Sequence, residues 1–297
     1  MGSKAVVKAI EGQEWLEPVA DAVQGAVGSI YKAGGEPANG VKNMLHGVWL
    51  GHPIHPIKAS VVIGAWTVAA FLDAKEAMGD ERVAPGADAA VAVGIAAAIG
   101  SAITGLTDYT GVDDKPRKRV GAMHAIVNGS ATLLYGASFL CRRSGHRSVG
   151  RALAALGYGL VGVGGFLGGT LAYEQNVGID HADREDLPQK WTAVGETSEI
   201  GEGANKVFMV GKVPILVANQ NGTFYAIGNT CAHLGGPLNE GKFENGTVTC
   251  PWHGSCVKLE DGEVVNGPSI YPQPTFDVRV RNGHIELRAS QTPNNAV

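Results

Sequence analysis

Cysteine is scarce in this sequence, with four residues in a chain of 297. So few cysteines over this length do not make the dense pattern of a disulfide-stapled domain. Two of them, Cys231 and Cys250, are each followed closely by a histidine. That pairing indicates a metal site rather than a disulfide framework, and it leaves Cys141 and Cys256 without a role.

Charge of either sign is also limited. Lys and Arg number 24 against 28 Asp and Glu, for a formal net charge of −4, and no basic run alternates with aromatic residues. The composition therefore predicts no nucleic-acid partner. The opening MGSKAVVKAIEGQEWLEP has acidic residues where a signal peptide would be apolar, and the first 30 residues contain no twin-arginine pair, so we expect no export signal.

The length suits two domains, and the composition changes between them. Residues 54–173 are dominated by Ala, Gly, Val, Leu and Ile, whereas the later sequence is polar and rich in turn signals. We expect an amphipathic helical segment at 1–50, a four-helix membrane domain at 51–175, a linker at 176–190 and a strand-rich domain at 191–290. The predicted fold class is thus an α-helical membrane domain followed by an all-β domain.

Four apolar stretches, at residues 57–72, 87–106, 120–140 and 152–172, each approach the roughly 20 residues that a transmembrane helix needs. Charged residues lie in the loops between them, as is typical of membrane helices. The alternative is a soluble bundle of buried helices, which can also be rich in Ala and Gly. We expect four transmembrane helices.

The distribution of Lys and Arg predicts the orientation of these spans. Eight lie near the termini and the second–third loop, against six near the other two loops. The positive-inside rule then places both termini in the cytosol, with the spans in a prokaryotic-type inner membrane. Ahead of them, residues 10–32 have apolar side chains at helical spacing, which predicts an amphipathic helix on the membrane surface or against the bundle.

Two loops in the C-terminal third combine thiols with imidazoles. NTCAHLGGPL supplies Cys231 and His233, and after sixteen residues CPWHGSCV supplies Cys250 and His253. A zinc finger would pair Cys with Cys and His with His. The mixed pairs fit a [2Fe–2S] cluster whose two irons have different ligands, Cys on one and His on the other.

The surrounding sequence completes a family resemblance. Asn221-Gly222 and Asn282-Gly283 each separate two β-rich runs, which predicts two hairpins flanking the loops. Residues 191–288 resemble a Rieske [2Fe–2S] ferredoxin domain over its whole length. The resemblance implies a [2Fe–2S] cluster held by Cys231, His233, Cys250 and His253, with one-electron transfer as its function.

Departures from the quinol-oxidising Rieske proteins indicate which class this is. Those proteins have an extra cysteine in each loop, at positions that are Gly236 and Trp252 here, and a tyrosine where this chain has Val257. Ser255 remains and could donate a hydrogen bond to a bridging sulfide. The set resembles ferredoxin-type or oxygenase-type domains, which implies a low to intermediate reduction potential.

A catalytic iron domain of the oxygenase kind has no place in this sequence. Such a site needs two His and a carboxylate, and His181 with Asp183 lacks a second His. We therefore expect an electron carrier or oxidoreductase component rather than a self-contained enzyme, with redox proteins or a quinone as partners and lipid around the helices. A redox sensor is a further interpretation.

Histidines cluster where the predicted spans meet the membrane face. GVWLGHPIHPIKAS contains His52 and His55, the third span has His124, and the second ends at Asp108. The HPxHP segment resembles a four-helix membrane family that accompanies Rieske domains and has no established function. In one interpretation these polar groups cap helix ends. In the other they form a second site, for quinone, a metal or haem. The axial ligands of a haem would be His124 with His52 or His55. Both interpretations stay open.

Overall fold

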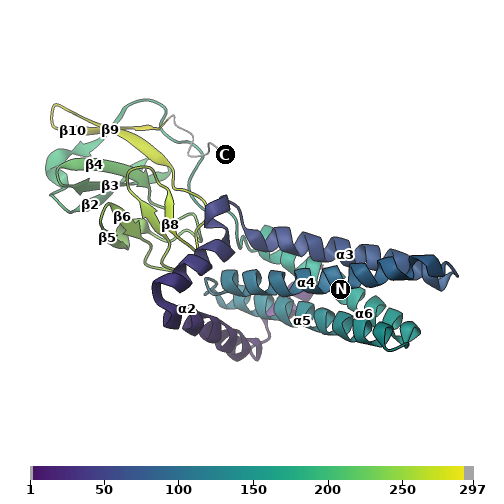
Figure 1. The fold of residues 1–297 in the computed structure, drawn as a ribbon. Coiled ribbons are helices and arrows are strands. Elements are labelled where there is room, and N and C mark those ends of the chain that lie inside the picture. The colour runs from purple at the N-terminus through teal and green to yellow at the C-terminus, as the bar shows by residue number, and fades with distance from the viewer. Residues whose placement is uncertain (1–2, 291–297) are drawn as a thin grey trace. The chain divides into compact units, whose positions relative to one another are not determined.

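The computed structural model describes residues 3–290 and shows a helical N-terminal region followed by a β region (Figure 1). Contacts divide these residues into two compact units. The helical unit lies within Met1–Ala38 and Pro53–Val177, and the β unit within Asn39–His52 and Gly178–Val297. The segment 39–52 therefore belongs with the β unit.

Six α-helices precede the strands. They are α1 Ser3–Glu11, α2 Leu16–His46, α3 Ile54–Ala77, α4 Ala84–Tyr109, α5 Lys115–Arg143 and α6 Arg147–Gly169, the last continuing as a π-helical turn, Thr170–Glu174. Local chemistry sets several of their ends. Asp114 caps α5 by accepting a hydrogen bond from the backbone N–H of Arg117 at 3.3 Å. Gly79 and Gly145 adopt positive φ where α3 and α5 end.

Among the described residues, three helical segments are long and apolar enough to cross a membrane: Ile54–Ala77, Glu81–Tyr109 and Arg147–Glu174. The four predicted spans are therefore confirmed only in part. Helix α5 has the length, with 29 residues, but it begins with KPRKR, ends with Arg142 and Arg143, and carries His124 and Asn128 between them. These polar residues hold its hydropathy below that of the other three.

The N-terminal helices lie on the bundle. The predicted helix at 10–32 is interrupted before Leu16, continues to His46 and has non-helical dihedrals at Gly35. Leu16 and Ala20 are buried against Ala122 of α5. Further along α2, Gln24 Nε2 donates hydrogen bonds to the carbonyls of Tyr109 and Val112. Of the two alternatives, the structure shows the packing against the bundle.

Helices α3 and α5 run parallel, because residues 69 positions apart pair along both. Three such pairs join them: His55 with His124, Trp66 with Tyr135, and Asp73 with Arg142. The Trp66 and Tyr135 rings stack with centroids 3.9 Å apart and planes 4° from parallel. Between these pairs the buried residues again match, Val62 with Ala131 and Ala69 with Ser138. The hairpins α3–α4 and α5–α6 are thus structural repeats of each other.

The glycines of α4 and α6 follow the same repeat. A Cβ at Gly94 would lie 2.1 Å from Trp66 Nε1, and a Cβ at Gly157 would lie 3.0 Å from the Tyr135 ring. These two glycines are 63 positions apart, and each accepts the aromatic ring of the other helix in its own hairpin. Glycine is therefore needed at both positions for close approach.

Charged groups meet at the bundle end farther from His55. The side chain of Arg142 is fully buried and pairs with Asp73 of α3 and Asp88 of α4, the latter at 3.2 Å. Arg147 of α6 contacts Glu76 of α3 at 2.5 Å and Asp88 at 2.9 Å. Buried charges are tolerated when paired in this way, and these pairs join all four helices.

Ten strands form two antiparallel sheets in the β unit. The larger sheet has the order β1-β10-β9-β4-β3-β2, formed by Thr192–Glu196, His284–Ala289, Thr275–Arg281, Thr223–Gly228, Val213–Gln220 and Asn205–Val210. The smaller sheet has the order β5-β6-β7-β8, formed by Lys242–Glu244, Thr247–Thr249, Cys256–Lys258 and Val264–Asn266.

The two predicted hairpins are confirmed. Gln220 pairs with Thr223 around Asn221-Gly222, and Arg281 pairs with His284 around Asn282-Gly283. Both turn residues have positive φ in each case, as a type I′ turn requires. Asn245-Gly246 makes a third turn of this kind between β5 and β6, which the sequence analysis missed although the signal is the same.

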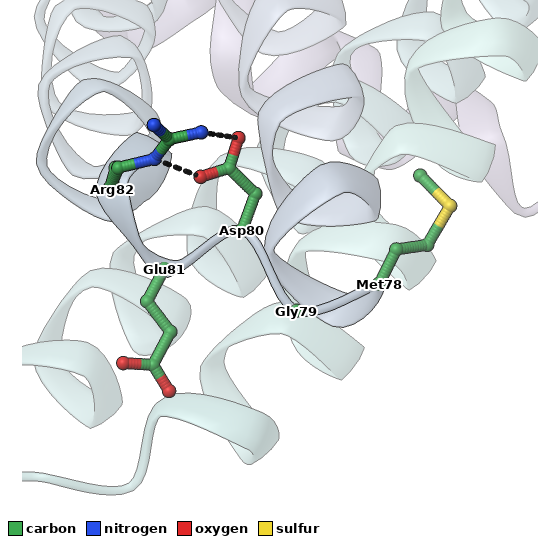
Figure 2. A pocket seen from close by; sticks show the side chains of 5 residues that line it. All are labelled: Met78, Gly79, Asp80, Glu81 and Arg82. Carbon is green, nitrogen blue, oxygen red and sulfur yellow. Dashed lines mark hydrogen bonds and ion pairs between the residues drawn. The ribbon is translucent and has the colours of Figure 1, made fainter.

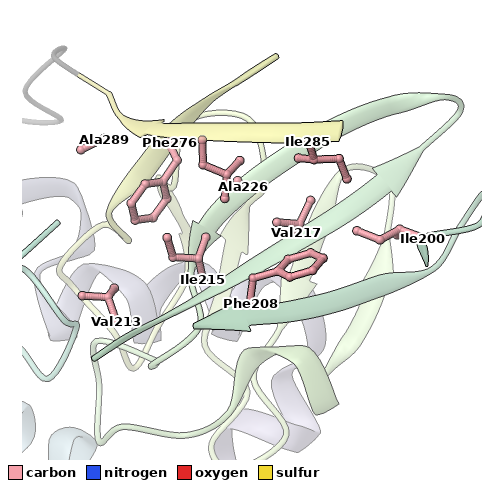
Figure 3. Close-up of a cluster of buried hydrophobic side chains, with 10 residues drawn as sticks. Ile200, Phe208, Val213, Ile215, Val217, Ala226, Phe276, Ile285 and Ala289 are labelled. Atoms are coloured by element: carbon pink, nitrogen blue, oxygen red, sulfur yellow. The ribbon is translucent and has the colours of Figure 1, made fainter. Parts of the chain in front are cut away.

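Two hydrophobic clusters support the sheets. One lies on the larger sheet and contains Phe208, Ile215, Val217 and Ile285 (Figure 3). The other contains residues of both sheets, such as Leu216 and Val248, together with Cys231 and Cys250. The cysteines of the two loops are thus part of a core that the sheets build.

Replacement of Gly94 tests the packing of the bundle. We expect Gly94→Ala to lower the free energy of unfolding of the detergent-solubilised protein by about 1–3 kcal/mol, because the added methyl group overlaps the Trp66 ring. Gly64→Ala in α3 is the matched control, since a Cβ there meets nothing within 4 Å. Equal unfolding curves for the two variants would contradict the packing.

Candidate metal centre

Two loops at one end of the β unit fold in the same way. The first follows β4, and the second joins β6 to β7. In the first, the Cys231 N–H donates to the carbonyl five residues later (2.9 Å), and its carbonyl accepts from Gly235 (2.8 Å). Cys250 has the same two bonds, to Ser255 (2.8 Å) and from Gly254 (3.1 Å). Gly235 and Gly254 have φ of 78° and 77°, a conformation that favours glycine.

The two thiols lie side by side beneath these turns. Cys231 is 1% exposed and Cys250 3%, and the two thiols are hydrogen-bonded to each other. This bond and the backbone N–H groups of Trp252 and His253 lower the pKa of Cys250. The same bond, with burial, raises the pKa of Cys231. N–H groups aimed at sulfur stabilise a thiolate, which is the form that ligates metal.

The two imidazoles face each other beside the thiols. The Nδ1 atoms of His233 and His253 are 3.2 Å apart, and the ring centroids are 4.8 Å apart. Two nitrogens bound at ~2.0–2.1 Å to one tetrahedral metal lie about 3.3–3.4 Å apart. Burial is the largest cause, and the neighbouring His253 the second, of the lowering of the pKa of His233 to about 3. The His233 ring is therefore neutral and can ligate a metal.

This donor set fits a [2Fe–2S] cluster of the Rieske type. Such a cluster takes two thiolates on one iron and two imidazoles on the other. Within residues 3–290, no group of three or more His, Cys, Asp or Glu side chains is arranged to hold a single metal ion. The structure places the four predicted ligands as one thiol pair, Cys231 and Cys250, and one imidazole pair, His233 and His253.

A third loop, between β8 and β9, packs over the second. The Ser255 hydroxyl is buried, accepts a hydrogen bond from the Ser269 N–H at 2.9 Å and donates to the thiol of Cys231. The buried side-chain amide of Gln273 takes the orientation in which both its nitrogen and its oxygen have partners. The nitrogen donates to the Thr230 carbonyl, and the oxygen accepts from the Ala232 N–H. The third loop thus fixes both cysteine loops.

Residues outside the loops also surround the imidazoles. The charges of His46, His181 and Lys42 each contribute to lowering the pKa of His233. Asn43 joins this segment to the third loop, because its Oδ1 accepts from the Gly267 N–H at 2.9 Å. The sequence analysis missed Lys42 and His46 as neighbours of the centre, since they lie about 190 positions away in the chain.

The predicted membrane site is brought together only in part. His55 of α3 and His124 of α5 lie with ring centroids 6.4 Å apart. Asp108 lies on α4, seven residues beyond the Ser101 carbonyl that His55 contacts, or roughly 10 Å along the helix. His52 belongs to the β unit. The pair His55 and His124 is therefore the core of any site here.

A surface pocket elsewhere on the helical unit contains neither histidine nor cysteine. It lies at the turn between α3 and α4 and is lined by Met78, Gly79, Asp80, Glu81 and Arg82 (Figure 2). Arg82 donates to Asp80 from Nε at 2.9 Å and from Nη2 at 3.4 Å. Arg82 and Asp80 thus pair within the turn, and none of the predicted site residues lines the pocket.

Comparison with protein families matches both parts of the chain. Residues 190–277 match the Rieske [2Fe–2S] domain. Residues 51–181 match a family described as predicted membrane protein (DUF2231). The expectation of a Rieske domain fused after a membrane domain is confirmed.

Three curated relatives resemble the Rieske part. Ferredoxin CarAc of Metapseudomonas resinovorans is 31% identical over 33% of this chain and 94% of its own length. The cytochrome b6-f complex iron-sulfur subunit of Chlorobaculum thiosulfatiphilum is 33% identical over 31% of this chain and 50% of its own. Human apoptosis-inducing factor 3 is 31% identical over 33% of this chain, which spans only 16% of that protein.

The packing between the loops can be tested without reference to a metal. A Cβ at Gly236 would lie 2.8 Å from Cys250 Sγ and 3.0 Å from the Trp252 ring. We expect Gly236→Ala to destabilise the protein by about 1–3 kcal/mol in thermal unfolding, because the loops must move apart. Gly201→Ala, where a Cβ meets nothing within 4 Å, should change stability by less than about 0.5 kcal/mol.

Proposed function

This chain belongs to the Rieske [2Fe–2S] family, and we propose that it is a membrane-anchored one-electron carrier. The observation that carries the proposal is the meeting of two buried thiols and two facing imidazoles in two adjoining loops. A [2Fe–2S] cluster bound there supplies reversible one-electron storage. The chain's own residues hold it, shield it from water and set its potential.

We assign Cys231 and Cys250 to one iron and His233 and His253 to the other. The thiols are almost fully buried, whereas both imidazoles are half-buried and closer to solvent. Electrons therefore enter and leave through the imidazole edge. Ser255 supports the thiol side, because a hydrogen bond donated to a ligating sulfur favours the reduced, more negative cluster.

The reduction potential of the [2Fe–2S] cluster should be low to intermediate. The positions that carry an extra disulfide in quinol-oxidising Rieske proteins are Gly236 and Trp252, and all four cysteines here are free of disulfides. Val257 replaces a tyrosine that would raise the potential further. The chain therefore lacks two groups that would make quinol its electron donor.

The helical region would serve as the anchor. We propose four spans, α3 to α6, with lipid around them and with the domain boundaries expected at residues 51–175 and 191–290. Helix α5 turns Tyr135 and Arg142 toward α3. The donor and acceptor are redox proteins, by analogy with ferredoxin and cytochrome b6-f relatives. A membrane quinone is the alternative partner.

Ligand replacement tests the assignment. The full-length protein in detergent should contain two irons, show nitrogen-ligated [2Fe–2S] EPR features and take up one electron per chain in a redox titration. Cys231→Ser or Cys250→Ser should abolish these signals, because each thiolate holds the same iron.

Cys256→Ser is the matched control, since Cys256 lies next to the second loop on β7 and has no ligand role in this assignment. It should retain the full cluster. Zinc in place of iron in the wild type, or an intact cluster in the Cys231 and Cys250 variants, would refute the assignment.

Cysteine labelling in intact cells tests the orientation. On the charge count, the β unit faces the cytosol and the α3–α4 turn faces outward. An impermeant thiol reagent should label Arg82→Cys, whose side chain is exposed, and should leave His284→Cys unlabelled until the membrane is opened. The wild type gives the background from its own cysteines. Labelling of His284→Cys from outside would reverse the orientation.

A further inference from the structure

The two helical hairpins hold a histidine each in the same way. His55 Nδ1 lies 2.9 Å from the Ser101 carbonyl of α4, and His124 Nδ1 lies 3.0 Å from the Gly164 carbonyl of α6. One turn later on each partner helix comes a glycine against which the ring lies. A Cβ at Gly105 would be 2.7 Å from His55, and one at Gly168 would be 3.1 Å from His124.

This arrangement fixes the tautomer of both imidazoles. A ring nitrogen facing a carbonyl must carry the proton, so Nδ1–H donates and Nε2 keeps its lone pair. Metal-ligating histidines are commonly oriented by this bond to a backbone carbonyl. The Asn128 amide nitrogen lies 3.3 Å from both nitrogens of His124 and donates to the His124 carbonyl at the shorter distance of 2.8 Å.

The separation of the rings indicates how they could share a metal. With a metal–nitrogen bond of ~2.0–2.1 Å and a ring centre roughly 1.1 Å behind its nitrogen, two imidazoles on opposite sides of one metal have centres about 6.2–6.4 Å apart, and a tetrahedral pair about 5.1 Å. His55 and His124 are 6.4 Å apart, with planes at 77°. The His233 and His253 rings, at 4.8 Å, are close to the tetrahedral value instead.

We propose that His55 and His124 form a bis-imidazole site for an iron porphyrin between the two hairpins. A six-coordinate metal with two imidazoles on opposite sides has four further ligands in the plane between them. No third His, Cys, Asp or Glu of residues 3–290 completes a metal group with this pair. An iron porphyrin supplies these four in-plane ligands itself.

Titration with haemin tests the proposal. Full-length protein in detergent should bind one haemin per chain with a sharp, six-coordinate low-spin spectrum. The nearly perpendicular imidazole planes should give a strongly anisotropic low-spin EPR signal. His55→Ala and His124→Ala should each weaken haemin binding at least tenfold and give a high-spin spectrum, and free imidazole should restore the low-spin form in His55→Gly and His124→Gly.

His146→Ala is the matched control, because His146 is exposed in the α5–α6 turn at the other end of the bundle. It should bind haemin as the wild type does. The cluster spectrum of each sample reports separately on the β unit, so loss of this proposal leaves the electron-carrier proposal intact. A high-spin wild type, or equal loss in His146→Ala, or no rescue by imidazole, would overturn the site.

Discussion

The metal centre depends on one backbone constraint: two loops must make the same tight turn so that four ligands can converge. In each turn the cysteine N–H donates to the carbonyl five residues later, and the cysteine carbonyl accepts from the N–H four residues later. Each turn also needs a glycine with positive φ, Gly235 in the first and Gly254 in the second. The thiols are then buried in a core shared by both sheets. The larger sheet, the small sheet and the third loop all serve to keep these two turns in contact.

Local signals made most of the β unit predictable from sequence. The hairpins at Asn221-Gly222 and Asn282-Gly283 follow from two residues that tolerate positive φ, and the ligand spacing follows from what one turn can reach. The contributions of Lys42, Asn43 and His46 could not be predicted, because they depend on tertiary packing of a segment far away in the chain. The hairpin at Asn245-Gly246 could have been predicted.

The internal repeat of the helical unit was not visible in the sequence. Most of its equivalent positions are filled by different residues, such as Trp66 and Tyr135, or Asp73 and Arg142, and only a few letters recur, such as His55 and His124. The contacts at equivalent positions recur instead. Each aromatic ring lies against a glycine, and each imidazole lies against a backbone carbonyl. Only the packed structure shows that the offsets of 69 and 63 positions hold over several turns.

The same repeat gives several polar residues of α5 a partner within the bundle. Its polar residues His124, Tyr135 and Arg142 lie on the side that meets α3, where each has a partner at the equivalent position. A paired charge or ring in a helix interface does not incur the cost of the same group facing lipid. A hydropathy average counts both alike, and in α5 it also includes the charged ends KPRKR and Arg142–Arg143. Low hydropathy alone is thus no argument against α5 as a fourth span.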